Sequence, residues 1–195
     1  MAILFLGPLV PPEGGFSIVT TKVYDQIFSE TNCFLVNRSK RYSIFGILYY
    51  LRKLLRIPIH FLLLCHQNHF TYVALSGGVG QIVDLLFLFV AYLFKSKLII
   101  HHHSFAYIYN KSFPLNLVYK MFPRARDIVL CEEMGDKLLS LYRPNLSFNP
   151  SNYIQIVSNS AWLDFAVVNE SPKSYKSHDL VFGFLSSPLK QKGLN

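Results

Sequence analysis

The chain has 195 residues, of which 51% are hydrophobic and only 15% are charged. A chain this apolar can bury the core of a globular domain, and its composition excludes intrinsic disorder. The formal net charge of +8 at pH 7 favours anionic partners such as phosphates, nucleic acid or an acidic membrane surface.

The first element that the sequence predicts is a short strand. Residues 2–6 form a continuous apolar run that ends at Gly7, as in a strand buried on both faces. A Pro-rich loop follows and ends at Gly14 and Gly15. Residues 16–28 then carry apolar side chains at nearly helical spacing. The chain therefore opens as a strand, a Gly-rich loop and a helix.

The next segment predicts a strand, a helix and two further strands. A strand is expected at residues 33–36, and residues 44–56 form a basic amphipathic helix that Pro58 should end. Residues 60–65 and 72–75 are strand candidates.

The rest of the chain keeps alternating between helices and strands. We expect helices at residues 81–94, 115–122 and 132–142, and strands at residues 97–100, 127–131 and 153–157. The helix at 81–94 is apolar nearly all round, which predicts that it is buried. Strands that alternate with helices at this spacing form a parallel sheet. The predicted fold class is therefore α/β, a Rossmann-like parallel sheet with helices on both faces.

A membrane span needs about 20 apolar residues, and the two most apolar stretches, residues 82–94 and 57–64, are shorter and contain Asp84 and Pro58. We therefore expect buried elements in both stretches, with a membrane-embedded segment as the alternative. Cys33, Cys65 and Cys131 are widely spaced and odd in number, which indicates free thiols in a reducing compartment.

The composition changes near the end of the chain. Residues 169–178 are polar and resemble a linker, whereas residues 179–185 form one more apolar strand candidate. We therefore expect a domain over residues 1–168, a linker over 169–178, and the first strand and loop of an incomplete second domain over 179–195.

Glycines follow two of the predicted strands. Gly14 and Gly15 come after the first strand, where ligands bind in doubly wound folds and where a helix start can hold an anion. Gly77, Gly78 and Gly80 occupy the equivalent place after a later strand, and Gly78 is a candidate for substrate contact. They lack the third glycine of the dinucleotide fingerprint. A plain turn remains the alternative at both sites.

Three histidines end the strand predicted at residues 97–100. Alternation along a strand places His101 and His103 on one face and His102 on the other. Such histidines could bind a metal, contact a sugar hydroxyl or fill space in the core. No Cys or carboxylate spacing supports a metal site, so we predict no metal and no cofactor.

Five segments in sequence order resemble the N-terminal half of a family 4-type glycosyltransferase with the GT-B architecture. The segments are ILFLGPLVPPEGGFS, LIIHHHSF, DIVLCEEMGDKLLSLY, IQIVSNSAW and DLVFGFLSSPLKQKGL. The resemblance implies two Rossmann-like domains with the active site between them. It also implies retaining transfer of a sugar from a nucleotide-sugar donor to a glycan or lipid-linked acceptor, as in polysaccharide synthesis.

The resemblance assigns roles to particular residues. Gly14 and Gly15 would approach the donor diphosphate and the acceptor, and His103 would contact the transferred sugar as the catalytic residue. His101 is the second choice for that contact. Lys192 matches a lysine that pairs with donor phosphates.

The chain also departs from the family pattern. Phe184 stands where an arginine is common, and the chain stops at Asn195, before the donor-binding half. We therefore expect a truncated or split enzyme that is inactive without a separate C-terminal half.

Two other interpretations stay open. The chain could be a non-catalytic module that binds a sugar or a phosphate, or it could contact a membrane peripherally through the basic helix at residues 44–56. The expected location is cytoplasmic, with contact at the inner face of the membrane as an alternative. Nucleic acid is not an expected partner, since no binding motif for it is present.

Overall fold

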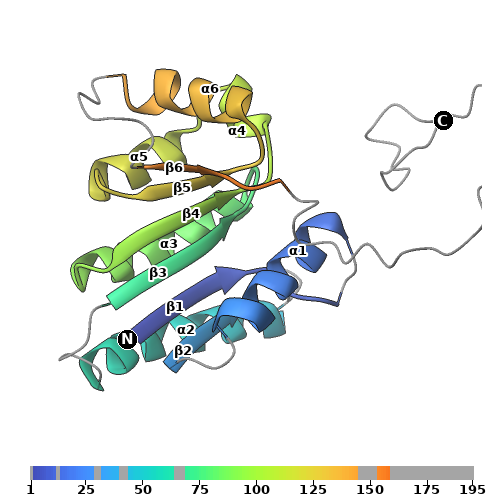
Figure 1. Ribbon diagram of the computed structural model, residues 1–195. Coiled ribbons are helices and arrows are strands. Elements are labelled where there is room, and N and C mark those ends of the chain that lie inside the picture. The colour runs from blue at the N-terminus through green and yellow to red at the C-terminus, as the bar shows by residue number, and fades with distance from the viewer. Residues whose placement is uncertain are drawn as a thin grey trace, which may run out of the picture. The chain divides into compact units, whose positions relative to one another are not determined.

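The computed structural model describes residues 2–11, 14–28, 32–39, 44–63, 69–144 and 153–158. Within these residues, six strands pair in parallel to form one sheet in the order β2-β1-β3-β4-β5-β6 (Figure 1). The strands are β1 (Ala2–Gly7), β2 (Asn32–Asn37), β3 (His69–Leu75), β4 (Lys97–His102), β5 (Arg126–Val129) and β6 (Ile154–Ile156). The protein thus has the Rossmann-like α/β fold that the sequence predicts.

The strand order reverses direction once, beside β1. The chain passes from β1 to β2 on one side and then returns past β1 to β3 on the other side. The segments that leave β1 and β3 therefore diverge at the carboxyl edge of the sheet. In doubly wound sheets this point of divergence is where ligands bind.

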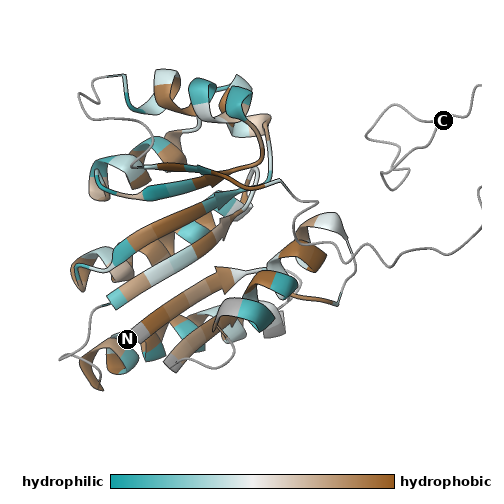
Figure 2. Cartoon of the chain, viewed as in Figure 1, coloured by the Kyte–Doolittle hydropathy of each residue, from teal (hydrophilic) through white to brown (hydrophobic). Residues whose placement is uncertain are grey.

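The central strand β1 explains why residues 2–6 are continuously apolar. Ile3 and Phe5 belong to the core on one face of the sheet, while Leu4 and Leu6 belong to the core on the other. All four side chains are completely buried, and Figure 2 shows that β1 is hydrophobic along most of its length. Each such side chain contributes about 1.5–3 kcal/mol through its burial.

One face of the sheet is covered by helix α1 (Gly15–Val23), which continues as the π-helix η1 (Tyr24–Phe28). Val19 and Val23 of α1 pack in the same core as Phe5 and Tyr72. The rings of Phe5 and Tyr72 stack at a centroid distance of 4.8 Å. The sheet has a hydrophobic core on each face, and the core on this face is the smaller one. This smaller core lies over β1 and β3.

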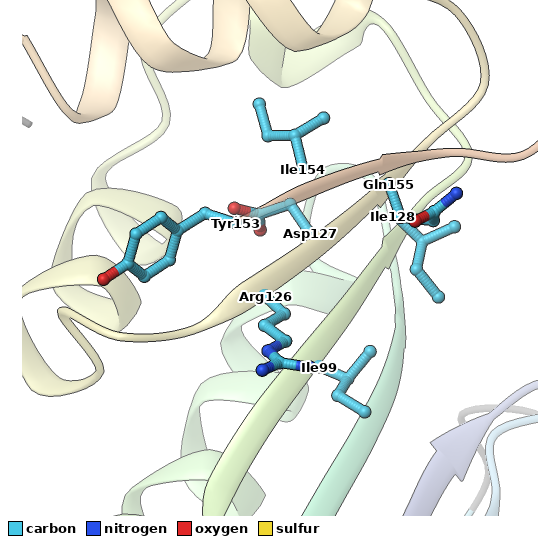
Figure 3. Close-up of a pocket in the computed structure, with 7 residues that line it drawn as sticks. All are labelled: Ile99, Arg126, Asp127, Ile128, Tyr153, Ile154 and Gln155. Carbon is cyan, nitrogen blue, oxygen red and sulfur yellow. The ribbon is translucent and has the colours of Figure 1, made fainter. Parts of the chain in front are cut away.

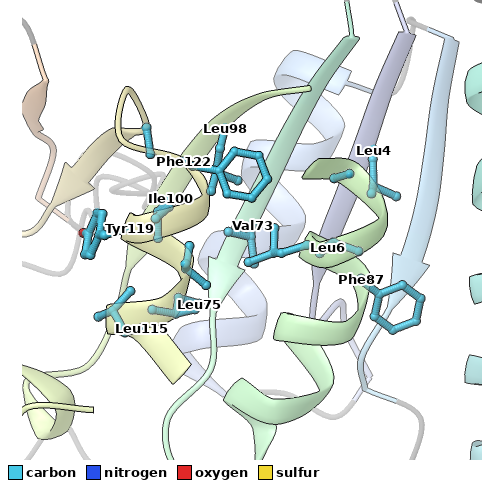
Figure 4. Packing of buried hydrophobic residues seen from close by; sticks show 14 of the residues in the cluster. Leu4, Leu6, Val73, Leu75, Phe87, Leu98, Ile100, Leu115, Tyr119 and Phe122 are labelled. Carbon is cyan, nitrogen blue, oxygen red and sulfur yellow. The ribbon is translucent and has the colours of Figure 1, made fainter. Parts of the chain in front are cut away.

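The other face carries the remaining helices of the described residues. They are α2 (Ile44–Leu63), α3 (Gly80–Leu93), α4 (Ala106–Tyr109), α5 (Phe113–Met121) and α6 (Glu132–Tyr142). Phe87 of α3 and Leu115 of α5 belong to one cluster with Leu4, Val73 and Ile100 of the strands (Figure 4). This larger core holds the helix layer on the sheet.

Helix α2 differs from the sequence prediction. It passes through Pro58 and ends at Leu63, so the predicted end at Pro58 and the beginning of the predicted strand at residues 60–65 are wrong. Proline in a helix removes one hydrogen bond, but Ile57 and Phe61, four residues apart, are both completely buried. Packing of this continuous apolar face outweighs the lost bond.

Helix α3 also differs, because it is not buried all round. Ile82 and Leu86 expose more than half of their side-chain surface to solvent. Within the described part of the chain, no helix combines the length and the apolar character that crossing a membrane requires. Of the two apolar stretches considered as spans, residues 57–63 lie in α2 and residues 82–93 lie in α3.

The chain divides into two units, Met1–Asp164 and Phe165–Asn195. The expected linker, the strand candidate at residues 179–185, Lys192 and Cys65 all lie outside the described residues, so these predictions stand untested. Cys33 and Cys131 are free thiols and half-buried. Burial raises the pKa of Cys33 to about 12, which keeps this thiol protonated and unreactive.

Gly7, the last residue of β1, lies beside Thr20 of α1. An added Cβ at Gly7 would lie 2.6 Å from Cγ2 of Thr20 and 3.1 Å from Cε1 of Phe5. Thr20 is completely buried, so its methyl group has little room to move. We predict that Gly7→Ala lowers the free energy of unfolding by about 1–3 kcal/mol, measured by urea denaturation.

Thr20→Ser supplies the matched control for this prediction. Serine lacks the clashing methyl group and keeps the hydroxyl that donates to the Phe16 carbonyl at 2.8 Å. Gly7→Ala should therefore cost less in the Thr20→Ser background than in the parent chain. An equal cost in both backgrounds would show that the close approach of Thr20 is not the cause.

Candidate functional site

The candidate site lies at the carboxyl edge of the sheet, where four neighbouring strands end. Gly7 at the end of β1 pairs with Asn37 at the end of β2. Leu75 at the end of β3 pairs with His102 at the end of β4. The loops that follow these strands therefore begin side by side.

The structure places His103 against the start of α1. The centroid of the His103 ring lies 4.5 Å from that of Phe16, which follows Gly15 in the chain. The His101 ring lies 4.0 Å from the His103 ring on the same face of the sheet. The Gly14–Gly15 segment and both histidines, predicted as site residues from distant parts of the sequence, thus meet at one place.

His102 points to the opposite face of the sheet, as strand alternation predicts. Its Nε2 lies 3.1 Å from Oδ1 of Asp127, a completely buried carboxylate that also accepts a hydrogen bond from the Tyr119 hydroxyl at 2.9 Å. The guanidinium of Arg143 lies 3.4 Å from Oδ2 of Asp127. The pairing of His102 and Tyr119 with Oδ1 of Asp127 thus engages the His102 ring inside the core. The three consecutive histidines consequently do not converge on one point, and the described residues contain no group of side chains that could hold a metal ion.

The two histidines on the α1 side keep polar atoms that are buried and unpaired. Nδ1 of His101 lies 2.6 Å from the Tyr72 hydroxyl, and Nε2 has no hydrogen-bond partner. Neither ring nitrogen of His103 has a partner among the described residues. A buried polar atom without a partner costs about 1–3 kcal/mol. A ligand that reached these nitrogens would recover that cost.

Burial keeps both rings neutral. It lowers the pKa of His103 to about 2, with a smaller contribution from the neighbouring His101, and it lowers the pKa of His101 to about 4. A neutral imidazole offers one N–H donor and one acceptor nitrogen. At neutral pH these rings can therefore hydrogen-bond a hydroxyl group, but they supply no positive charge.

Gly14 and Gly15 are exposed, and packing does not require glycine at either position. An added Cβ at Gly15 would meet nothing within 4 Å, and at Gly14 it would meet only Oγ of Ser17 at 3.9 Å. Gly14 has extended backbone, with φ of −169°, and no side chain caps α1. No described residue therefore crowds the Cβ positions of Gly14 and Gly15 at the start of α1, and the N–H groups of its first turn favour an anion.

Gly78 lies at the same edge of the sheet, in the turn after β3, and its backbone conformation explains why it is a glycine. Its φ of +58° is a left-handed conformation that favours glycine, so the turn itself explains this residue. Next to it, an added Cβ at Gly77 would lie 3.8 Å from Oγ of Ser104, the residue that follows His103. The turn after β3 is thus a neighbour of the histidines, and a contact between Gly78 and substrate stays a prediction.

Sequence reasoning missed Arg38, whose buried guanidinium joins three elements at this edge. It donates to Oγ of Ser76 after β3, to the Ala74 carbonyl within β3, and to Asp84 of α3. Asp84 in turn accepts a hydrogen bond from the Ser76 N–H at 3.0 Å. The signal was Asp84 itself: a lone carboxylate in an apolar helix needs a buried cationic partner.

Asn37 fixes the loop after β1. Its Oδ1 accepts hydrogen bonds from the Leu9 N–H at 3.1 Å and from the Ser39 N–H at 2.8 Å. The Val10 N–H donates to Oγ1 of Thr21 at 3.0 Å, which ties the loop to α1. These bonds hold Leu9 and Val10, the part of the loop just after β1.

A hollow lies elsewhere on the α1 side of the sheet, over β5 and β6 (Figure 3). It has a volume of about 430 Å³, and its lining includes Ile99, Ile128 and Gln155. Its two charged residues are the exposed Arg126 and the buried Asp127, which is already engaged with His102 and Tyr119. The edge beside His103 remains the better candidate site, because it brings the unpaired ring nitrogens of His101 and His103 beside the start of α1.

No protein-family model, curated protein or solved structure matches the chain. The arrangement of residues at the carboxyl edge is therefore the basis for the functional argument.

The neutral histidines predict how stability depends on pH. An unfolded histidine has a pKa of about 6.5, so below that pH the unfolded chain binds protons that the folded His103 does not. Stability should fall as the pH drops from about 7 to about 4.5, with a contribution of up to about 1.4 kcal/mol per pH unit from each such histidine. The free energy of urea unfolding, measured across this range, checks the expectation.

Carboxylates also make stability depend on pH, and His103→Gln isolates the part of this dependence that comes from His103. The variant should lose less stability than the parent chain over the same pH interval, because one proton-binding difference has been removed. Parallel curves for the two proteins would mean that His103 is not held neutral in the folded state.

Proposed function

We propose that this chain forms the acceptor-side N-terminal half of a retaining glycosyltransferase with the GT-B architecture. The observation that carries the proposal is the pair of unpaired ring nitrogens on His103, beside the open start of α1. Neutral hydrogen-bonding groups and a site for an anion then lie within one small region. A nucleotide sugar presents both sugar hydroxyls and a diphosphate.

His103 suits the sugar part of such a ligand. Hydroxyl groups of a sugar donate and accept hydrogen bonds, and the neutral imidazole can do both. The Phe16 ring at 4.5 Å limits the approach from the α1 side, so a bound hydroxyl would have a restricted orientation. His101 can add a second contact through its unpaired Nε2.

The start of α1 suits the diphosphate. Sugar transfer leaves negative charge on the departing nucleotide, and fixed N–H groups stabilise such charge in the transition state. The open backbone of Gly14 and Gly15 permits a close approach. Arg38 is paired with Asp84 and so is not free to neutralise the phosphates.

The proposal needs a second Rossmann-like domain to grip the nucleotide. The described residues form one Rossmann-like sheet and supply no second one. We therefore expect the purified 195-residue chain to transfer no sugar from UDP-, GDP- or ADP-sugars to glycan acceptors. Radiolabelled transfer assays check this, and turnover by the chain alone would contradict the proposed division of the site.

Ligand binding to the half-site can be measured without turnover. We predict that sugars and nucleotide sugars shift the ring NMR signals of His103, and that His103→Ala weakens this binding by about three- to tenfold, as expected for one hydrogen bond. The matched control is His69→Ala at the start of β3, on the opposite edge of the sheet, which should leave affinity unchanged. If no sugar ligand shifts His103, or if His103→Ala binds equally well, the proposed site is wrong.

The same observation would also suit a module that binds a sugar or a phosphate without catalysis. The two functions differ once a donor-binding domain is supplied, either in a longer chain or as a separate polypeptide. A glycosyltransferase half then gives transfer that depends on His103, whereas a binding module gives none.

A further inference from the structure

A broad apolar surface covers the outside of the helix layer on the face of the sheet away from α1. Most of the exposed large hydrophobic side chains of the described residues lie on α2, on α3 or on the residue before α3. We call this surface the α2–α3 face. Its members are Ile47, Leu48, Leu51, Leu55, Ile59, Leu62, Leu63, Val79, Ile82, Leu86, Phe89, Tyr92 and Leu93.

Helix periodicity gathers these side chains into stripes. On α2, Leu48, Leu55 and Ile59 are separated by about one or two turns and are 57%, 73% and 55% exposed. On α3, Ile82, Leu86 and Leu93 repeat in the same manner. Each helix therefore has two apolar faces, one on the core and one toward the outside. A helix that covered only the core would need the first face alone.

The two stripes belong to one surface, because α2 and α3 pack side by side on the same face of the sheet. Tyr50 of α2 and Phe87 of α3 have ring centroids 6.2 Å apart. At the other end of the contact, the rings of Phe61 and Phe94 are 5.2 Å apart. A continuous apolar surface of this kind marks an interaction site on a protein.

The charges on this face are positive. Arg52 and Arg56 are exposed on α2, one turn apart and beside the apolar stripe. Helix α2 contains no acidic residue, and the carboxylate of α3, Asp84, is buried and paired with Arg38. The α2–α3 face therefore presents apolar side chains with arginines and no exposed carboxylate.

Positive charge continues beyond the end of α3. Lys95, Lys97 and Arg124 are exposed around a hollow of about 270 Å³ that Tyr92 and Phe122 also line. Aromatic and basic side chains together suit the headgroup region of a bilayer, where one end of a side chain is apolar and the other is wet.

We infer that the α2–α3 face docks on the surface of a membrane that contains anionic lipids. The apolar stripes enter the boundary between headgroups and acyl chains, while Arg52 and Arg56 pair with lipid phosphates. Because no described helix can span a bilayer, the two helices lie in the plane of the surface. This inference rests on different residues from the proposed glycosyltransferase site and does not depend on it.

Charge complementarity favours lipid over a second copy of the chain. A symmetric partner would bring the same apolar stripes, but it would offer its own arginines and no carboxylate from this face to Arg52 and Arg56. Anionic headgroups supply the missing negative charge. A lipid surface can also bury the apolar stripes of both helices at once, because its area is not limited.

The experiment is co-sedimentation of the full chain with large vesicles of phosphatidylcholine, with and without phosphatidylglycerol. We expect binding that is stronger to the anionic vesicles and weaker at high salt. Leu55→Gln/Ile59→Gln should reduce binding to both kinds of vesicle. Arg52→Glu/Arg56→Glu should reduce binding to the anionic vesicles by about tenfold or more, and circular dichroism should confirm that each variant is folded.

A matched control distinguishes this face from net charge alone. Lys22→Glu/Lys111→Glu changes the net charge by the same amount, but these lysines lie on α1 and in the turn before α5. It should bind anionic vesicles more tightly than the arginine variant. If the two double variants bind equally, or if the parent chain does not bind vesicles, the inference is wrong.

Sedimentation velocity without lipid tests the second copy. A stable dimer that Leu55→Gln/Ile59→Gln dissociates, together with no vesicle binding, would assign the α2–α3 face to self-association and overturn the inference.

Discussion

β1 lies between β2 and β3 in parallel register, and its side chains are excluded from water on both faces. This pairing makes β1 the centre about which the chain changes direction. It also places the loop that leaves β1 beside the loops that leave β2 and β3. The candidate site depends on this arrangement, because its parts come from segments that lie far apart in the sequence.

The polar side chains at the carboxyl edge fall into two groups with different roles. Arg38, Asp84 and Asn37 are occupied with other protein groups and hold the strand ends and loops in place. His101 and His103 instead keep ring nitrogens that no described residue satisfies. A rigid frame around groups with unused hydrogen-bonding capacity is the arrangement that ligand binding requires, since it limits the ordering that a ligand must impose.

The abundance of apolar residues in this chain has two structural outcomes. Part of it forms the two cores on either side of the sheet, and part of it remains on the outer surface of α2 and α3. Core packing does not use the outer stripe, so that stripe adds no stability to the isolated fold. The carboxyl edge and the α2–α3 face thus give the domain two separate places for contact with other molecules.

The sequence by itself determined the fold class, most elements and the faces of the three histidines. Local patterns suffice for these features, because the spacing of apolar residues along the chain identifies strands and helices. The alternation of side chains along β4 likewise separates His102 from His101 and His103. Only the tertiary structure decided that α2 continues past Pro58, that α3 leaves one side exposed, and that Arg38 pairs with Asp84. Each of these depends on what lies across the sheet or on a neighbouring helix, and such long-range packing leaves no periodic signal in the chain.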